Sequence, residues 1–146
     1  RSSDLQETGK RVVSEKTAHR MRQMMRLVVT EGTGSKANVP GYDVGGKTGT
    51  AEKIVAGHYD HNKLISSFVG VFPADAPRYV IYVMMDEPKP SKQSQGFATA
   101  GWVAAPAVAR IIASTASILG MPADHKQAEQ DMAASLRQYV STGSHE

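Results

Sequence analysis

The stretch Val44-Gly45-Gly46-Lys47-Thr48-Gly49-Thr50-Ala51 combines one cation and two hydroxyl groups with small residues, three of which are glycines. Glycines let a backbone approach a ligand closely, and a neighbouring lysine and threonines can then bind an anionic group of that ligand. The stretch therefore indicates a site for an anion. Two mechanisms fit it, and the flanking sequence has to decide between them.

The residues before this stretch predict one helix. Ser14 is a good N-cap, and apolar residues recur at helical spacing over residues 15–30, before Gly32 and Gly34. We expect the methionines of this helix to fill the core, and its arginines to form a solvated face. These residues are Met21, Met24 and Met25, and Arg20, Arg22 and Arg26.

The residues after it predict three strands, over 47–55, 64–72 and 79–85. The short turn at 73–77 makes the last two strands an antiparallel hairpin, and the third strand, apolar throughout, should be covered on both faces. Residues 56–63 read as a polar loop. His58 and His61 in it have a spacing seen in metal ligands, but no third ligand accompanies them, so we expect a solvated loop and no metal.

A second helix is predicted over residues 102–119, with Pro106 in its first turn and one apolar stripe. That stripe consists of Val108, Ile111, Ile112 and Leu119. Residues 124–140 predict an amphipathic tail helix that could dock on the domain or on a partner, with Ala128, Met132, Leu136 and Tyr139 on its apolar side. The order of elements predicts an α+β fold, with antiparallel strands packed between helices. The expected divisions are a lead-in (1–13), a domain segment (14–122) and a tail (123–146).

Composition narrows the class of protein. The 146 residues suit one domain or a piece of one, and 40% hydrophobic residues are enough for a core. The net charge of +3 comes without a basic patch interleaved with aromatics, so no nucleic acid is expected as partner. The absence of cysteine excludes disulfides and thiol nucleophiles. No apolar run reaches the ~18 residues of a membrane span, and without an initiator methionine we expect part of a longer protein.

The first mechanism is nucleotide binding. Residues 41–48 satisfy the phosphate-loop pattern G-x-x-x-x-G-K-[ST], and the third strand ends in Asp86, which could hold a metal. A phosphate loop, however, leaves a buried strand and enters a helix at its lysine. Here no apolar strand precedes the glycines, and β-branched residues follow them. A P-loop NTPase is therefore the remote alternative.

The second mechanism is acyl transfer. Lys47-Thr48-Gly49 is the K-T-G element of penicillin-recognising serine enzymes, which lines their active-site cleft. Lys47, Thr48 and Thr50 can bind the carboxylate of a peptide, and Gly49 leaves room for the acyl group. The Thr50 backbone N–H can donate to the developing oxyanion.

The sequence on both sides of K-T-G makes this three-letter pattern a specific signal for one family. Glu31-Gly32-Thr33-Gly34, Val39-Pro40-Gly41-Tyr42, the extended K-T-G stretch and Ser67-Phe68-Val69-Gly70-Val71-Phe72-Pro73-Ala74 closely resemble the C-terminal half of class B penicillin-binding proteins. Asp86-Glu87-Pro88 and Gly96-Phe97-Ala98-Thr99-Ala100-Gly101-Trp102 resemble the cell-division member, as found in alphaproteobacteria. Only the C-terminal part of the transpeptidase domain is represented.

This resemblance implies a penicillin-binding, serine β-lactamase-like fold and a peptidoglycan D,D-transpeptidase that acts through an acyl-serine. It also implies stem peptides, β-lactams and other division proteins as partners, no cofactor, and a location on the periplasmic side of the inner membrane, anchored by a segment upstream. Five antiparallel strands are expected in the family's sheet, of which this chain would supply three.

One departure from the family is large. No serine here has lysine three residues later or asparagine two residues later, so the nucleophile motif S-x-x-K and the S-x-N motif are absent. We therefore expect this chain alone to be inactive while the longer protein is an enzyme. A non-catalytic scaffold and a β-lactam sensor of the same fold remain alternatives. Unpaired strand edges could also make the piece self-associate.

Overall fold

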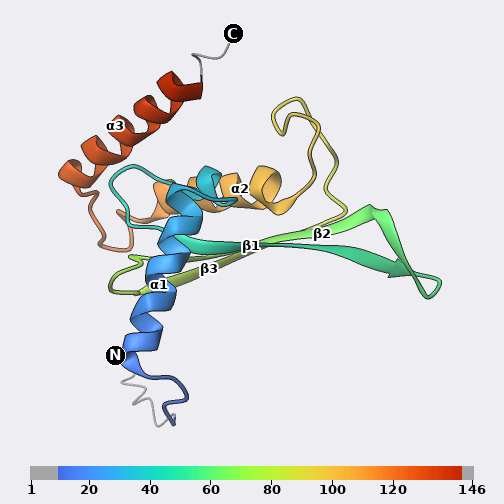
Figure 1. Ribbon diagram of the computed structural model, residues 1–146, viewed down its shortest axis with the longest axis horizontal. Helices are drawn as coiled ribbons and strands as arrows, with labels where there is room; N and C mark the ends of the chain where they lie inside the picture. The colour runs from blue at the N-terminus through green and yellow to red at the C-terminus, as the bar shows by residue number, and fades with distance from the viewer. Residues whose placement is uncertain (1–9, 143–146) are drawn as a thin grey trace.

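An antiparallel sheet forms the centre of the computed structural model, which describes residues 10–142 (Figure 1). Its strands are β1 (Gly45–Val55), β2 (His58–Phe72) and β3 (Tyr79–Asp86), in the order β1-β2-β3. β2 is therefore central, and β1 and β3 are the edges of the sheet within the described residues. The antiparallel pairing of β2 with β3 confirms the predicted hairpin.

Helix α1 (Glu15–Thr30) has the predicted bounds, and the Ser14 side chain accepts a hydrogen bond from the Thr17 backbone N–H at 3.1 Å. The helix packs against β1, where Gly45 allows a close approach. A Cβ atom on Gly45 would lie 3.3 Å from the backbone nitrogen of Arg26. The prediction that the methionines fill the core is wrong for Met21 and Met24, which are half exposed.

Helix α2 (Ala100–Thr115) covers the opposite face of the sheet, together with the short 3₁₀ helix η1 (Ser35–Ala37). The core between them is fully buried and includes Phe68, Phe72, Val108 and Ile112. The helix begins two residues earlier than predicted, so Pro106 lies inside it and not in its first turn. Of the predicted stripe, Ile111 is partly exposed because only one side of α2 faces the sheet, and the partly exposed Leu119 lies beyond the helix, which ends at Thr115 and not at 119 as predicted.

The predicted loop at 56–63 is wrong. β2 begins at His58, and only Ala56 and Gly57 separate it from β1. Both have positive φ, 51° and 86°, which is the geometry of the two-residue turns that suit a twisted hairpin. The polar composition of 58–63 misled the prediction, because this end of the hairpin projects beyond α1 and α2 (Figure 1) and most of its residues are exposed.

The prediction that β3 is covered on both faces is also wrong. Its residues alternate between half-buried and exposed, as on a strand with one solvated face. Tyr79, Ile81 and Val83 pack against the core under α2. Val80, Tyr82 and Met84 point to the other face and are 70%, 62% and 57% exposed.

The tail forms helix α3 (His125–Thr142), which follows a backbone hydrogen bond from Asp124 N–H to the Gly41 carbonyl. Arg26, which was expected to be solvated, also links this helix to the domain. The Arg26 guanidinium binds Asp131 of α3 at 3.2 Å and Asp43 at 3.0 Å, and it donates to the Val44 carbonyl at 2.9 Å. Met132 and Leu136 are exposed, and the Tyr139 side chain lies outside the described residues.

Candidate functional site

The K-T-G residues lie on β1, at the open edge of the sheet. Alternation along the strand places Thr48 and Thr50 on the face that α2 covers, and Lys47 on the other. Because β1 has no neighbour on its outer side among the described residues, the Lys47 side chain can fold around the edge. Its ammonium donates to the Thr48 carbonyl at 2.8 Å and to the Thr48 hydroxyl at 3.2 Å.

A third hydroxyl continues this row. Thr33 lies in the turn after α1, and its Oγ1 is 2.9 Å from Oγ1 of Thr48. The turn can pass so close because Gly34 has no side chain. A Cβ atom there would lie 2.9 Å from the Phe68 ring. The result is a hydrogen-bonded series of Lys47, Thr48 and Thr33 along one edge of the sheet, with donors available to an anion.

Thr50 connects the strand to the start of α2. Its hydroxyl accepts a hydrogen bond from the Ala100 backbone N–H at 3.1 Å, one of the N–H groups that a helix cannot satisfy internally. The hydroxyl proton remains available to a ligand. The positive end of the α2 dipole is therefore directed toward the same edge.

A cavity of about 490 Å³ lies beside this edge. Hydroxyl groups and one lysine dominate its lining, which consists of Thr33, Ser35, Lys36, Thr48, Thr50, Thr99, Gly101 and Trp102. The Lys36 ammonium lies 4.1 Å from the centre of the Trp102 ring, and Trp102 stacks on Phe97 at 5.2 Å. Hydroxyl donors beside a cation suit a carboxylate.

Lys36, Thr33 and Trp102 were not predicted as site residues. Thr33 belongs to a segment that supported the family resemblance, and Trp102 is the only tryptophan of the chain. Trp102 also belongs to a segment that supported the resemblance. Lys36 had no such signal, because its place beside the site depends on the turn between α1 and β1.

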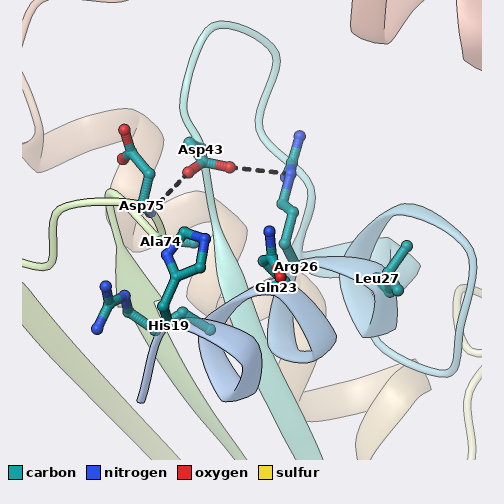
Figure 2. A pocket seen from close by; sticks show the side chains of 8 residues that line it. His19, Gln23, Arg26, Leu27, Asp43, Ala74 and Asp75 are labelled. Atoms are coloured by element: carbon teal, nitrogen blue, oxygen red, sulfur yellow. Dashed lines mark hydrogen bonds and ion pairs between the residues drawn. The ribbon is translucent and has the colours of Figure 1, made fainter. Parts of the chain in front are cut away.

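A second cavity of about 480 Å³ lies between α1 and the turn after β2 (Figure 2). His19, Leu27 and Ala74 line it, and Arg26 beside them is already engaged by Asp43. Asp43 also accepts a hydrogen bond from the Asp75 backbone N–H at 2.9 Å. Since these two cavities have almost the same volume, the side chains that line them decide which one is the candidate site. The first contains the K-T-G hydroxyls and is the candidate site.

The far end of the β1–β2 hairpin has ion pairs of its own. Lys53 binds Asp86 and Glu87, each at 2.9 Å, and hydrogen bonds to Glu87 and then Asp86 raise the pKa of its ammonium. His61 Nδ1 lies 2.6 Å from Glu52, and this hydrogen bond raises the pKa of the imidazole. Over residues 10–142, no three His, Cys, Asp or Glu side chains come together as metal ligands.

The structure contradicts the phosphate-loop alternative. Lys47 and Thr48 lie inside strand β1, whereas a phosphate loop would begin a helix at this point. The sheet is antiparallel throughout the described residues, and nucleotide-binding folds of that kind are built on parallel strands.

Comparison with known sequences points to one family. Residues 2–113 match the model of the penicillin binding protein transpeptidase domain. A probable peptidoglycan D,D-transpeptidase FtsI from Caulobacter vibrioides is 47% identical over 77% of this chain, and stage V sporulation protein D from Bacillus subtilis is 45% identical over 83%. The chain spans only about a fifth of these relatives, 21% and 18% of their lengths.

Solved structures agree with the sequence comparison. The transpeptidase domain of penicillin-binding protein 3 from Burkholderia pseudomallei superposes with a TM-score of 0.68 at 43% identity, over 80% of this chain and 34% of that one. Penicillin-binding protein 3 from Mycobacterium tuberculosis, complexed with ampicillin, gives a TM-score of 0.67 at 37% identity, over 78% of this chain and 26% of that one. These likenesses confirm the predicted α+β class and the penicillin-binding fold. The chain belongs to the penicillin-binding protein transpeptidase domain family.

Proposed function

We propose that this chain is the C-terminal part of the transpeptidase domain of a septal peptidoglycan D,D-transpeptidase. One observation carries the proposal: the hydrogen-bonded series Lys47, Thr48 and Thr33 at an open strand edge, beside a hydroxyl-lined cavity. The relatives named as D,D-transpeptidases support the reaction class.

The residues of β1 would bind the acyl donor. The terminal carboxylate of a D-Ala-D-Ala stem peptide would accept hydrogen bonds from Thr48 and Thr50, with the Lys47 ammonium and Lys36 supplying positive charge. Gly49 would let the peptide backbone lie along the strand. The Thr50 backbone N–H would donate to the oxyanion that forms when a serine attacks the scissile carbonyl, a contribution typically worth about 3 kcal/mol.

The attacking serine would come from outside these residues, because the chain lacks S-x-x-K and S-x-N. This polypeptide alone is therefore proposed to be inactive. β-Lactams, which imitate the stem peptide, would acylate the longer protein, and two neighbouring structures are complexes with ampicillin and aztreonam.

The remaining proposals concern place and organisation. The longer protein would work on the periplasmic side of the inner membrane, among other division proteins, and would need an anchor outside this chain. Over the described residues, no helix is long and apolar enough to span a bilayer. The boundaries of the domain segment at residues 14 and 122, and the role of the tail, remain predictions.

Labelling with a fluorescent penicillin tests the function. The longer protein should be labelled and the 146-residue chain should not. In the longer protein, Lys47→Met should slow labelling by about tenfold to a hundredfold, the effect of one charge-assisted hydrogen bond. Lys89→Met, which removes an exposed lysine from the loop after β3, is the matched control and should label normally.

The other outcomes distinguish the alternatives. A folded longer protein that is never labelled would contradict the enzyme and favour a non-catalytic scaffold. Rapid acylation without transpeptidation, followed by very slow release, would favour a β-lactam sensor. An adduct in the intact mass of the 146-residue chain would contradict the assignment of the nucleophile to another segment.

A further inference from the structure

Lys36 and Trp102 lie between two cavities. Both residues line the hydroxyl-rich cavity beside Thr48 and Thr50, and both also line a third cavity of about 680 Å³ between α2 and the loop after β3. The third cavity has Arg110 as a second cation, and none of the described residues that line it is acidic. A ligand that extends from the first of these cavities into the other would therefore pass the Trp102 ring and reach positive charge.

The Trp102 ring is held in a fixed position relative to strand β1. The backbone just before it is bonded to the sheet twice. Ser66 Oγ donates to the Ala98 carbonyl at 2.6 Å, and the Ala100 backbone N–H donates to the Thr50 hydroxyl at 3.1 Å. Since Ser66 is fully buried, the first of these bonds is shielded from water. The start of α2 therefore holds the ring beside the K-T-G residues.

The ring contacts one cation and one further aromatic ring. The Lys36 ammonium lies 4.1 Å from its centre, and the Phe97 ring stacks on it at 5.2 Å. Phe97 is 51% exposed, so it presents apolar surface to a ligand. An ammonium group has three N–H donors, so Lys36 can bind a carboxylate while it stays over the ring. These three side chains together suit an aliphatic chain that ends in a carboxylate.

Transpeptidation also needs a place for the acceptor amine. The terminal D-Ala of the donor carries both the scissile nitrogen and the carboxylate that Thr48 and Thr50 would bind. Once this residue has left, the acceptor nitrogen has to attack the acyl carbonyl from the space that the leaving nitrogen vacated, because both steps exchange a nitrogen at the same carbon. The rest of the acceptor then extends past Thr48 and Thr50, where Lys36 and Trp102 line the cavity.

We propose that Lys36, Phe97 and Trp102 form the acceptor subsite, an inference that rests on the proposed function. An acceptor with its amine and a carboxylate on one carbon places that carboxylate at Thr48 and Thr50. Its aliphatic chain lies on the two aromatic rings, and a second carboxylate binds Lys36. The neutral amine forms a C–N bond to the acyl carbon, the C–O bond to the serine breaks, and one amine proton ends on the serine oxygen.

The fate of the acyl-enzyme tests this subsite. Each acylated molecule reacts either with the acceptor or with water, so the ratio of the two products does not depend on how much enzyme is folded. The longer protein would be acylated with a thioester donor in the presence of one D-amino acid at a time. D-Alanine has a short side chain, D-norleucine adds three methylenes, and D-2-aminoadipate has the length of D-norleucine but ends in a second carboxylate.

Both parts of the subsite should change this product ratio. D-Norleucine should exceed D-alanine by about tenfold, because one side of the added methylenes is buried on the rings. D-2-Aminoadipate should exceed D-norleucine by about twofold to fivefold, the effect of one exposed ion pair.

Substitutions separate the rings from the charge. Trp102→Ala should remove the advantage of D-norleucine, and Trp102→Phe should retain most of it. Lys36→Met should remove only the advantage of D-2-aminoadipate, and Lys36→Glu should reverse it. Lys92→Met removes an exposed lysine from the loop after β3, so it is the matched control and should change neither ratio.

The contrary outcomes are distinct. Equal ratios for D-alanine and D-norleucine would overturn the subsite. A Lys36→Glu protein that still prefers D-2-aminoadipate, or a Lys92→Met protein that loses this preference, would contradict the role of Lys36. A longer protein that forms no acyl-enzyme would refute the proposed function and this inference with it. One that is acylated and then hydrolysed, with no preference among the acceptors, would refute this inference alone.

Discussion

Gly46→Ala should disrupt the sheet at the base of the candidate site. A Cβ atom on Gly46 would lie 2.5 Å from two atoms of the Phe68 ring and 2.5 Å from the Val69 carbonyl oxygen. Non-bonded carbon atoms normally approach to about 3.5 Å, so β1 has to move by roughly 1 Å. Phe68 cannot turn aside because it is fully buried, and the Val69 oxygen belongs to the backbone of the paired strand.

The size of the effect follows from this geometry. Overpacking a core costs about 1–3 kcal/mol, and a clash with backbone belongs at the upper end of that range. A loss of about 3 kcal/mol lowers the melting temperature by roughly 10 °C in a domain of this size. The displaced segment carries Lys47 and Thr48, so their hydrogen bonds to each other and to Thr33 should also weaken.

Gly57→Ala provides the matched control. Gly57 has φ of 86° at the hairpin turn, and nothing lies within 4 Å of its Cβ position. The cost is then conformational only, about 1 kcal/mol. Calorimetry at one protein concentration measures both variants, and hydrogen exchange should show lost protection in β1 for Gly46→Ala alone. Equal melting temperatures for the two variants would refute the reasoning from close packing.

Three further changes test other contacts. Arg26→Met should destabilise the chain by about 2 kcal/mol in urea denaturation, because it removes a donor to the carbonyl of the buried Val44 and breaks the part-buried pair with Asp43, whereas Arg20→Met on the exposed side should not. Thr50→Val should cost about 1 kcal/mol by removing the acceptor at the start of α2, and Thr50→Ser should retain most stability. Glu52→Gln should lower the raised pKa of His61 toward 6.5 in an NMR titration. The contribution of that pair to stability is complete below pH 6.5 and is lost as pH rises through the raised value; an unchanged His61 pKa would contradict it.

Local patterns in the sequence were sufficient for several elements. The bounds of α1 followed from Ser14 and from apolar spacing, since both act within one or two turns of a helix. The K-T-G stretch and its neighbours indicated the family and the penicillin-binding fold, because close backbone approach restricts those positions to particular residues. Lys47, Thr48, Gly49 and Thr50 as substrate-binding residues remain a prediction.

Other features depended on the tertiary structure. Residues 58–63 are polar, so composition alone could not distinguish a loop from a strand with solvent on both faces. Residues 79–85 of β3 are all apolar, yet their burial depends on which elements cover them, and α1 packs mainly on β1. In the sequence nothing distinguishes Arg26 from the other arginines of α1, because its ion-pair partners Asp43 and Asp131 come from distant segments. Lys36 and Trp102 lie beside Thr48 only because the tertiary structure brings η1, β1 and the start of α2 around one cavity. Local interactions determine the helices, strands and motifs. Contacts between distant segments decide which side chains are buried, which form ion pairs and which lie beside the site.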